Sequence, residues 1–123
     1  MILVDTSVWI DHFRVADHRL IALMGLREAA IHPFVLGELA IGSIPQRDMV
    51  LAELNKLPTA RPATPGEVMH LIARHRLFGT GIGYIDAHLL AAACLADGLV
   101  VWTHDRRLLA AAVGLGVAAR LSH

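Results

Sequence analysis

Four carboxylates of this 123-residue chain stand in unusually apolar surroundings. Asp5 and Asp105 come just after runs of large apolar residues, whereas Glu38 and Asp86 interrupt apolar segments with a helical pattern. A charge at the border of a core costs free energy unless a partner offsets it. Carboxylates that gather in one place raise each other's pKa unless a cation holds them ionised, and oxygen ligands favour Mg²⁺ or Mn²⁺. The joint pattern predicts a cation site.

Each of the four acids, taken alone, has a simpler explanation. Asp86 is expected in the first turn of a helix, where a carboxylate complements the helix dipole. Glu38 could be partly exposed or paired with an arginine, and Asp5 and Asp105 could cap the ends of strands. The chain has only eleven acids, and four of them lie in its most apolar stretches, which favours the joint explanation.

Strands and helices alternate among the elements that would position these acids. Residues 1–5 and 99–103 have the composition of buried strands, and ligands of open α/β sheets bind at the carboxyl ends of such strands. The alternation predicts a single domain, residues 1–123, with a three-layer α/β/α fold and a mostly parallel sheet. Further strands are expected at 30–32, 59–61 and 117–119, and helices at 8–14, 17–29, 34–41, 45–56, 68–75, 84–96 and 106–113.

Local signals predict how several of these helices begin. Ser7 is expected to cap the first helix, and Thr64 and Glu67 have the spacing of a capping box. Three glycines within residues 79–83 indicate a flexible loop before the longest helix, and without a following G-K-[ST] this loop is not predicted to cradle phosphate. Cys94 is expected to be a small buried residue. One cysteine excludes an intrachain disulfide and fits a reducing cytoplasm.

The basic residues are almost all arginine, although the formal net charge is zero. Arginine binds phosphate through a planar fork that lysine lacks. Arg14, Arg106 and Arg107 lie near the ends of elements expected to reach the carboxylates, and Arg74 and Arg76 flank the glycine loop. These arginines are candidates for contacts to nucleic-acid phosphates.

The chain is apolar for a small protein, with 55% hydrophobic residues and a mean hydropathy of +0.54. No apolar run approaches the ~18 residues of a membrane span, and no signal sequence precedes the first strand. We therefore expect a cytoplasmic protein without a membrane partner. Some of its apolar surface is expected to be covered by a second copy or by another chain.

The order and spacing of the motifs resemble a PIN-domain ribonuclease of the VapC toxin type, part of a type II toxin–antitoxin system. The resemblance spans essentially the whole chain. Its motifs are Asp5-Thr6-Ser7 after the first strand, Val35-x-x-Glu38-Leu39-x-x-Gly42 on a helix, Asp86-Ala87 followed by Leu90-Ala91-Ala92, and Thr103-x-Asp105-x-x-Leu108 after a late strand.

The resemblance implies hydrolysis of RNA with Mg²⁺, for which Mn²⁺ can substitute. Asp5, Glu38 and Asp86 would bind the metal, and Asp105 would complete the set directly or through water. Ser7 and Thr103, which lie beside these acids in the motifs, would orient the metal's waters. The resemblance also implies a cognate antitoxin that covers apolar grooves and places a basic side chain among the acids, in a homodimer or a toxin–antitoxin hetero-oligomer.

Other functions are less compatible with the sequence. A haloacid-dehalogenase-like phosphatase would use Asp5 as nucleophile, but it would carry a second aspartate where this chain has Ser7. A non-catalytic PIN-like interaction module is expected to have lost acids, and all four are present. A metal-free nuclease could use two of the eight histidines. His70 and His75 are five residues apart and off one helix face, and His104 is expected to point away from the carboxylates as a structural or solvated residue.

Overall fold

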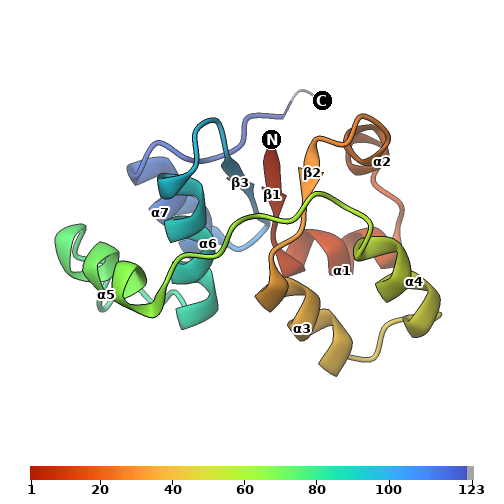
Figure 1. Ribbon diagram of the computed structural model, residues 1–123, viewed down its shortest axis with the longest axis horizontal. Helices are drawn as coiled ribbons and strands as arrows, with labels where there is room; N and C mark the ends of the chain where they lie inside the picture. The colour runs from red at the N-terminus through yellow and green to blue at the C-terminus, as the bar shows by residue number, and fades with distance from the viewer. Residues whose placement is uncertain (122–123) are drawn as a thin grey trace.

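Three short parallel strands form the centre of the fold (Figure 1). They are β1 (Ile2–Val4), β2 (Ala29–Ala30) and β3 (Val100–Trp102), in the order β2-β1-β3. Ile2 lies opposite both Ala29 and Val100, and Val4 lies opposite Trp102. The computed structural model describes residues 1–121. The predicted strands at 59–61 and 117–119 are single bridges, Ile31 with Thr59 and Val101 with Ala118.

Helices flank the sheet on both sides, as Figure 1 shows. This arrangement confirms the predicted three-layer α/β/α architecture with a parallel sheet. The core comprises mainly aliphatic side chains of the strands and of the helix faces turned toward them. The helices are α1 (Thr6–Arg14), α2 (His18–Gly25), α3 (Pro33–Ile41), α4 (Arg47–Leu54), α5 (Pro65–Arg74), α6 (Tyr84–Leu95) and α7 (Arg106–Gly114).

The ends of β1 and β3 are tied together by the main chain. The N–H of Asp5 donates to the carbonyl of Trp102 at 2.9 Å, one residue beyond the last residue of β1. Parallel pairing then brings the segments that follow both strands to the same edge of the sheet. Asp5, directly before α1, and Thr103, directly after β3, therefore lie side by side, as the sequence predicted from the strand ends.

The second helix is much shorter than predicted. It covers His18–Gly25, and Ala29, expected at its end, belongs to β2 instead. Asp17 caps its start through the N–H groups of Arg19 and Leu20. Arg27, with φ of +55°, stands in a left-handed turn after the helix. The apolar residues within 20–29 are thus divided between a helix and a strand.

Three further expectations are corrected by local backbone geometry. The fourth helix begins at Arg47 rather than Pro45, because Gln46 has a positive φ of 49°. Asp5, not Ser7, stands at the N-cap position of α1, and the Ser7 hydroxyl donates to the Asp5 carboxylate. Cys94 is exposed rather than buried, and it lines a groove between α5 and α6.

The capping box at the start of α5 is present as predicted. The N–H of Glu67 donates to the Thr64 hydroxyl at 3.1 Å, and the N–H of Thr64 donates to the Glu67 carboxylate at 2.8 Å. Across residues 1–121, the structure contains no helix that is both long and apolar enough to cross a bilayer.

Candidate carboxylate site at the edge of the sheet

Asp5 is the most firmly held of the four predicted acids. It is 5% exposed, and its Oδ2 accepts from the Ser7 hydroxyl at 2.6 Å and the Thr103 hydroxyl at 2.8 Å. The two hydroxyls lie 3.3 Å apart, although 96 residues separate them in sequence. Two donors from different elements fix the direction of the Asp5 carboxylate and leave its Oδ1 without a donor among the described residues.

Glu38 reaches the same edge from α3 and is held by α1. The Thr6 hydroxyl donates to Glu38 Oε1 at 2.7 Å. Glu38 is exposed, so its carboxylate remains in contact with solvent. The resemblance assigned no separate role to Thr6, which lies between Asp5 and Ser7. Its hydroxyl thus links the first turn of α1 to the Glu38 carboxylate on α3.

Asp86 lies in the first turn of α6, and its Oδ2 accepts from the N–H of Gly83 at 2.9 Å. Partial burial raises the pKa of Asp86, and the negative charges of Asp5, Asp105 and Glu38 raise it further. The bond from Gly83 acts in the opposite direction. The electrostatic influence of the other three acids on Asp86 supports the prediction that the four carboxylates share one region of the molecule.

Asp105 caps α7 instead of pointing freely from the end of β3. Its Oδ1 accepts from the N–H groups of Arg107 and Leu108, both at 2.9 Å. Its own N–H donates to the Thr103 hydroxyl at 3.0 Å. Thr103 is therefore bonded to both aspartates that follow the strands, and it fixes their relative positions.

The four carboxylates have a common pattern: one oxygen of each accepts hydrogen bonds and the other has no donor within residues 1–121. Within that range, no three acidic, histidine or cysteine side chains converge closely enough to form a ready-made metal cage. Mg²⁺ usually keeps several waters and is bound through one or two carboxylates, whereas structural Zn²⁺ takes four direct ligands. Spaced carboxylates with one open oxygen each fit a hydrated Mg²⁺.

The predicted arginines occupy different positions. Arg14 is the last residue of α1, and Arg106 is the first residue of α7, next to Asp105; both are exposed. Arg107 lies against the glycine loop. A Cβ at Gly81, where φ is +87°, would stand 2.9 Å from Cδ of Arg107. The absence of a side chain at Gly81 therefore gives Arg107 its place beside the start of α6.

His104 is the polar residue that the sequence prediction undervalued. Its N–H donates to the Ser7 hydroxyl at 3.0 Å, and its ring Nδ1 lies 2.5 Å from Oδ2 of Asp11 on α1. The ring contacts Asp11 rather than the four carboxylates. The partners are 93 residues apart, so only the tertiary structure reveals the pair.

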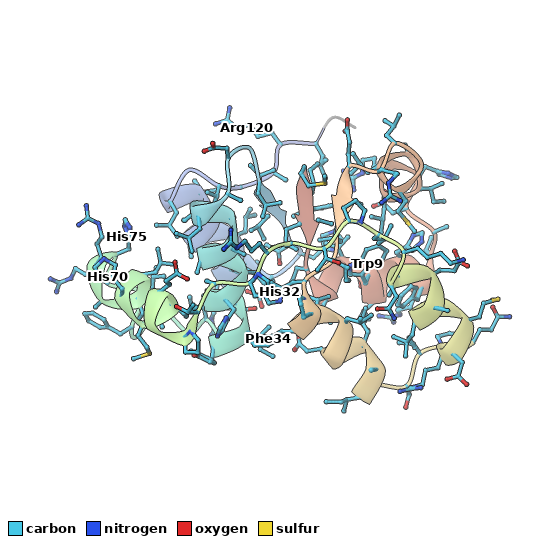
Figure 2. All side chains as sticks on the ribbon, viewed as in Figure 1. Trp9, His32, Phe34, His70, His75 and Arg120 are labelled. Atoms are coloured by element: carbon cyan, nitrogen blue, oxygen red, sulfur yellow. The ribbon has the colours of Figure 1, made fainter. Side chains whose placement is uncertain are left out.

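Two buried histidines lie beneath this edge, between the helices that carry Glu38 and Asp86. Figure 2 shows His32 beside Phe34 between α3 and α6. The rings of Phe34 and His88 have centroids 4.6 Å apart, and His32 Nδ1 accepts from the Phe34 N–H at 3.0 Å. Burial, reinforced by His88, lowers the pKa of His32 to about 4. Both histidines are neutral at pH 7.

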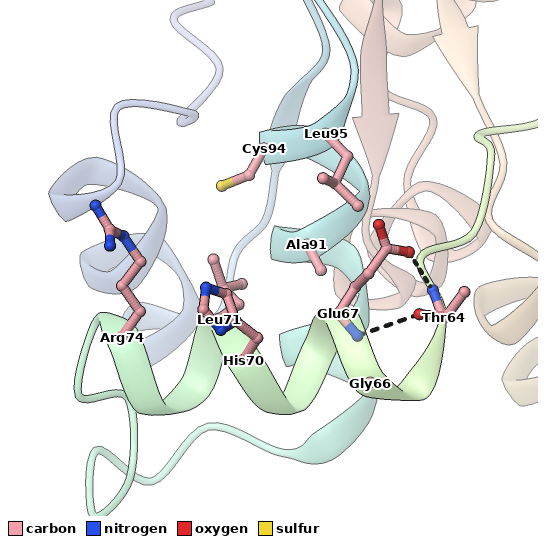
Figure 3. A pocket seen from close by; sticks show the side chains of 9 residues that line it. All are labelled: Thr64, Gly66, Glu67, His70, Leu71, Arg74, Ala91, Cys94 and Leu95. Carbon is pink, nitrogen blue, oxygen red and sulfur yellow. Dashed lines mark hydrogen bonds between the residues drawn. The ribbon is translucent and has the colours of Figure 1, made fainter.

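A separate groove lies between α5 and α6 and is drawn in Figure 3. It encloses about 510 Å³ and includes Cys94 and Leu95. None of the four acids lines it, so this groove is distinct from the carboxylate edge.

Comparisons with known proteins agree with this geometry. The family model of the PIN domain matches residues 2–114. Ribonuclease VapC32 from Mycobacterium tuberculosis strain H37Rv is 52% identical over 118 residues, covering 96% of this chain and 95% of the relative. Ribonuclease VapC32 from strain CDC 1551 matches to the same extent.

A solved structure extends the agreement to the fold. The crystal structure of PAE2754 from Pyrobaculum aerophilum aligns with a TM-score of 0.56 and 21% sequence identity, and the alignment covers 94% of this chain and 96% of that one. At this identity the likeness concerns the fold alone. With a match over residues 2–114 and two VapC relatives of nearly the same length, this chain belongs to the PIN-domain family and to its VapC type.

Proposed function

We propose that this chain is a Mg²⁺-dependent endoribonuclease that acts as the toxin of a toxin–antitoxin pair in the cytoplasm. The observation that carries the proposal is the set of carboxylates at the edge of the sheet, where the charges of Asp5, Glu38 and Asp105 act on Asp86. The identity to a ribonuclease along nearly the whole chain supports RNA as the substrate. The family match removes the basis for a haloacid-dehalogenase-like phosphatase.

In this proposal the open oxygens of Asp5, Glu38 and Asp86 would hold a hydrated Mg²⁺, some of them through its waters, and Asp105 would complete the set directly or through water. When bound, Mg²⁺ would supply an activated water and neutralise charge that develops on the phosphate. The Ser7 and Thr103 hydroxyls hold the Asp5 carboxylate in one direction, and the Thr6 hydroxyl does the same for Glu38. These donors orient the ligands before the substrate arrives, which limits reorganisation during the reaction.

Arg106 and Arg107 directly follow Asp105, and we assign them to contacts with substrate phosphates. Both are exposed, and Arg107 is placed beside the start of α6 by its contact with Gly81. Their positive charge offsets the repulsion between an RNA phosphate and the acidic edge. Arg14, at the other end of α1, would contact a phosphate farther along the strand.

A partner for the apolar surface is the second part of the proposal. Large side chains such as Ile41, at 89% exposure, and Val113, at 63%, remain uncovered on this chain. An antitoxin that covers apolar grooves and places a basic side chain against the open carboxylate oxygens would silence the site. A homodimer would cover further apolar area, and size-exclusion chromatography with light scattering would measure it.

The test is cleavage of RNA by the purified chain in the presence of Mg²⁺, with EDTA and with Mn²⁺ restored. Cleavage is expected only with either cation, and it should be lost in Asp5→Asn. Cleavage that survives EDTA would contradict the metal-dependent mechanism. Failure of the unmodified chain to bind Mn²⁺ in calorimetry would favour a non-catalytic interaction module instead.

The toxin assignment has its own test in growing cells. Induction of the chain is expected to arrest growth, and co-expression of the cognate antitoxin, sought as a short reading frame directly upstream of the gene, should relieve the arrest. Growth arrest by Asp5→Asn at equal expression would contradict RNA cleavage as the cause.

A further inference from the structure

His104 is clamped along α1 at two points. Its N–H donates to the hydroxyl of Ser7, and its ring nitrogen Nδ1 contacts the carboxylate of Asp11. Ser7 and Asp11 are four residues apart on α1, so they share one face of the helix, one turn apart. The imidazole, whose centroid also lies 6.1 Å from that of the Trp102 ring, is therefore held in place rather than turning freely in solvent.

The contact with Asp11 decides which ring nitrogen of His104 is available. An ionised carboxylate only accepts hydrogen bonds, so Nδ1 carries the hydrogen in this pair. Nε2 is then the outward nitrogen, and it has no partner among residues 1–121. The side chain of His104 is 37% exposed, which leaves room for a ligand to reach it.

The position of His104 relates it to the substrate of the proposed ribonuclease. It lies between Thr103, which bonds Asp5, and Asp105. The Ser7 hydroxyl that accepts from the His104 N–H also donates to Asp5, so a phosphodiester bound at the carboxylates would have a neighbouring sugar within reach of this residue. The negative charge of Asp11, whose side chain is 53% exposed, disfavours a second phosphate at this point. A neutral hydroxyl suits the position better.

We propose that Nε2 of His104 contacts the ribose 2′-hydroxyl of a nucleotide adjacent to the cleaved bond, and that this contact favours RNA over DNA. The inference rests on the proposed ribonuclease function. A 2′-hydroxyl is both donor and acceptor, so it can bond Nε2 with or without a hydrogen on that nitrogen. Asp11 is the positioning residue, and Arg14, three residues farther on the same face of α1, is placed to meet the next phosphate.

The test combines protein variants with single-atom changes in the substrate. The probe is a 5′-labelled RNA hairpin, chosen as the fastest-cleaved member of a pool with a randomised loop, and remade with one 2′-deoxynucleotide at each position around the cut. One deoxy position should lower kcat/KM of the unmodified chain about tenfold, the effect of one lost hydrogen bond. His104→Ala should lower cleavage of the all-RNA hairpin by a similar factor and be insensitive to that deoxy position.

Two further variants separate contact from structure. Asp11→Asn keeps an acceptor for Nδ1 and should retain most of the deoxy effect, whereas Asp11→Ala should lose it. His75→Ala, an exposed histidine after the end of α5, should behave like the unmodified chain. Melting temperatures close to that of the unmodified chain would show that the variants are folded.

The outcomes separate this inference from the function on which it rests. If His104→Ala lowered kcat/KM by the same factor on the all-RNA hairpin and on the deoxy hairpin, the two effects would be independent. This result would overturn the inference alone. No cleavage by the unmodified chain would contradict the proposed function and the inference together.

Discussion

Helix α3 with its N-cap residue His32, and helix α6, each contribute one carboxylate of the site and one buried histidine, and the two pairs are arranged in opposite ways. Glu38 and Asp86 bond to different donors, the Thr6 hydroxyl and the Gly83 N–H. His32 and His88 instead pack together around Phe34, with ring centroids 5.1 and 4.6 Å from it. The carboxylates remain separate and solvated, whereas the histidines are enclosed.

The difference shows that the chain holds its ionisable groups in two ways, as accessible carboxylates and as enclosed, neutral imidazoles. At the edge, hydroxyl and N–H donors orient one oxygen of each acid, and the other oxygen has no donor among the described residues. In the enclosed cluster, His32 Nε2 and His88 Nδ1 lack partners among the described residues, and burial favours the neutral ring. Substitutions at the edge should therefore alter activity with little change in stability, and substitutions in the cluster should do the reverse.

The largest effect is expected from Asp5→Asn. The amide still accepts from Ser7 and Thr103 but lacks the charge that binds a cation. RNA cleavage should fall on the order of 10³-fold, comparable to the loss of a strong transition-state contact, while the melting temperature changes little. Asp97→Asn, an exposed acid beyond the end of α6, is the matched control and should retain activity. A large loss of stability in Asp5→Asn would contradict the expectation that edge residues determine activity and cluster residues determine stability.

The enclosed cluster predicts a pH dependence of stability. His32 has a pKa lowered from 6.5 to about 4, so the folded state binds fewer protons than the unfolded chain in this interval. The contribution of His32 is complete above about pH 6.5 and is lost as pH falls toward 4, by up to about 3 kcal/mol. Denaturant titrations at several pH values would measure this slope.

His32→Asn provides the comparison for that slope, because asparagine keeps an acceptor for the Phe34 N–H and does not titrate. The slope should become shallower but should not vanish, since burial also lowers the pKa of His88. His75→Asn, at an exposed histidine, should leave the slope unchanged. An identical slope in His32→Asn and the unmodified chain would contradict the assignment.

A smaller effect is expected from Thr103→Val at the edge. The substitution preserves shape but removes the hydroxyl that donates to Asp5 and accepts from the Asp105 N–H. Loss of such a supporting bond should weaken Mn²⁺ binding or activity about 10- to 100-fold. Calorimetry and kcat/KM would report it, and Thr103→Ser should restore both. Failure of serine to restore them would indicate a packing defect.

The smallest effect is expected far from both regions, at the start of α5. Thr64→Ala removes the hydroxyl of the capping box and should lower the free energy of unfolding by about 1 kcal/mol without changing cleavage. Ser43→Ala, at an exposed loop residue, is the control. Denaturant unfolding would measure both variants, and an altered cleavage rate in Thr64→Ala would mean that α5 is coupled to the edge.

The sequence predicted the parallel sheet and the order of the elements because these depend on local patterns. An apolar strand that ends at an aspartate is visible in a short stretch, as at Asp5. The partners of the acids were not visible, since Thr6 with Glu38 and Ser7 with Thr103 are long-range pairs. The face of α6, the longest helix, that would be exposed was equally hidden. Its sequence is apolar on every side, so nothing local indicated that Cys94 would face outward.

Gly81 has a consequence for the mutational tolerance of this protein. Its positive φ strains any other residue, and a Cβ at this position would lie 2.9 Å from Cδ of Arg107, so the arginine side chain would have to move. Every replacement would strain the loop before α6 and displace Arg107, although glycine itself contributes no functional group. In a selection for variants that have lost RNA cleavage, codon 81 should therefore be recovered together with the codons of the four acids.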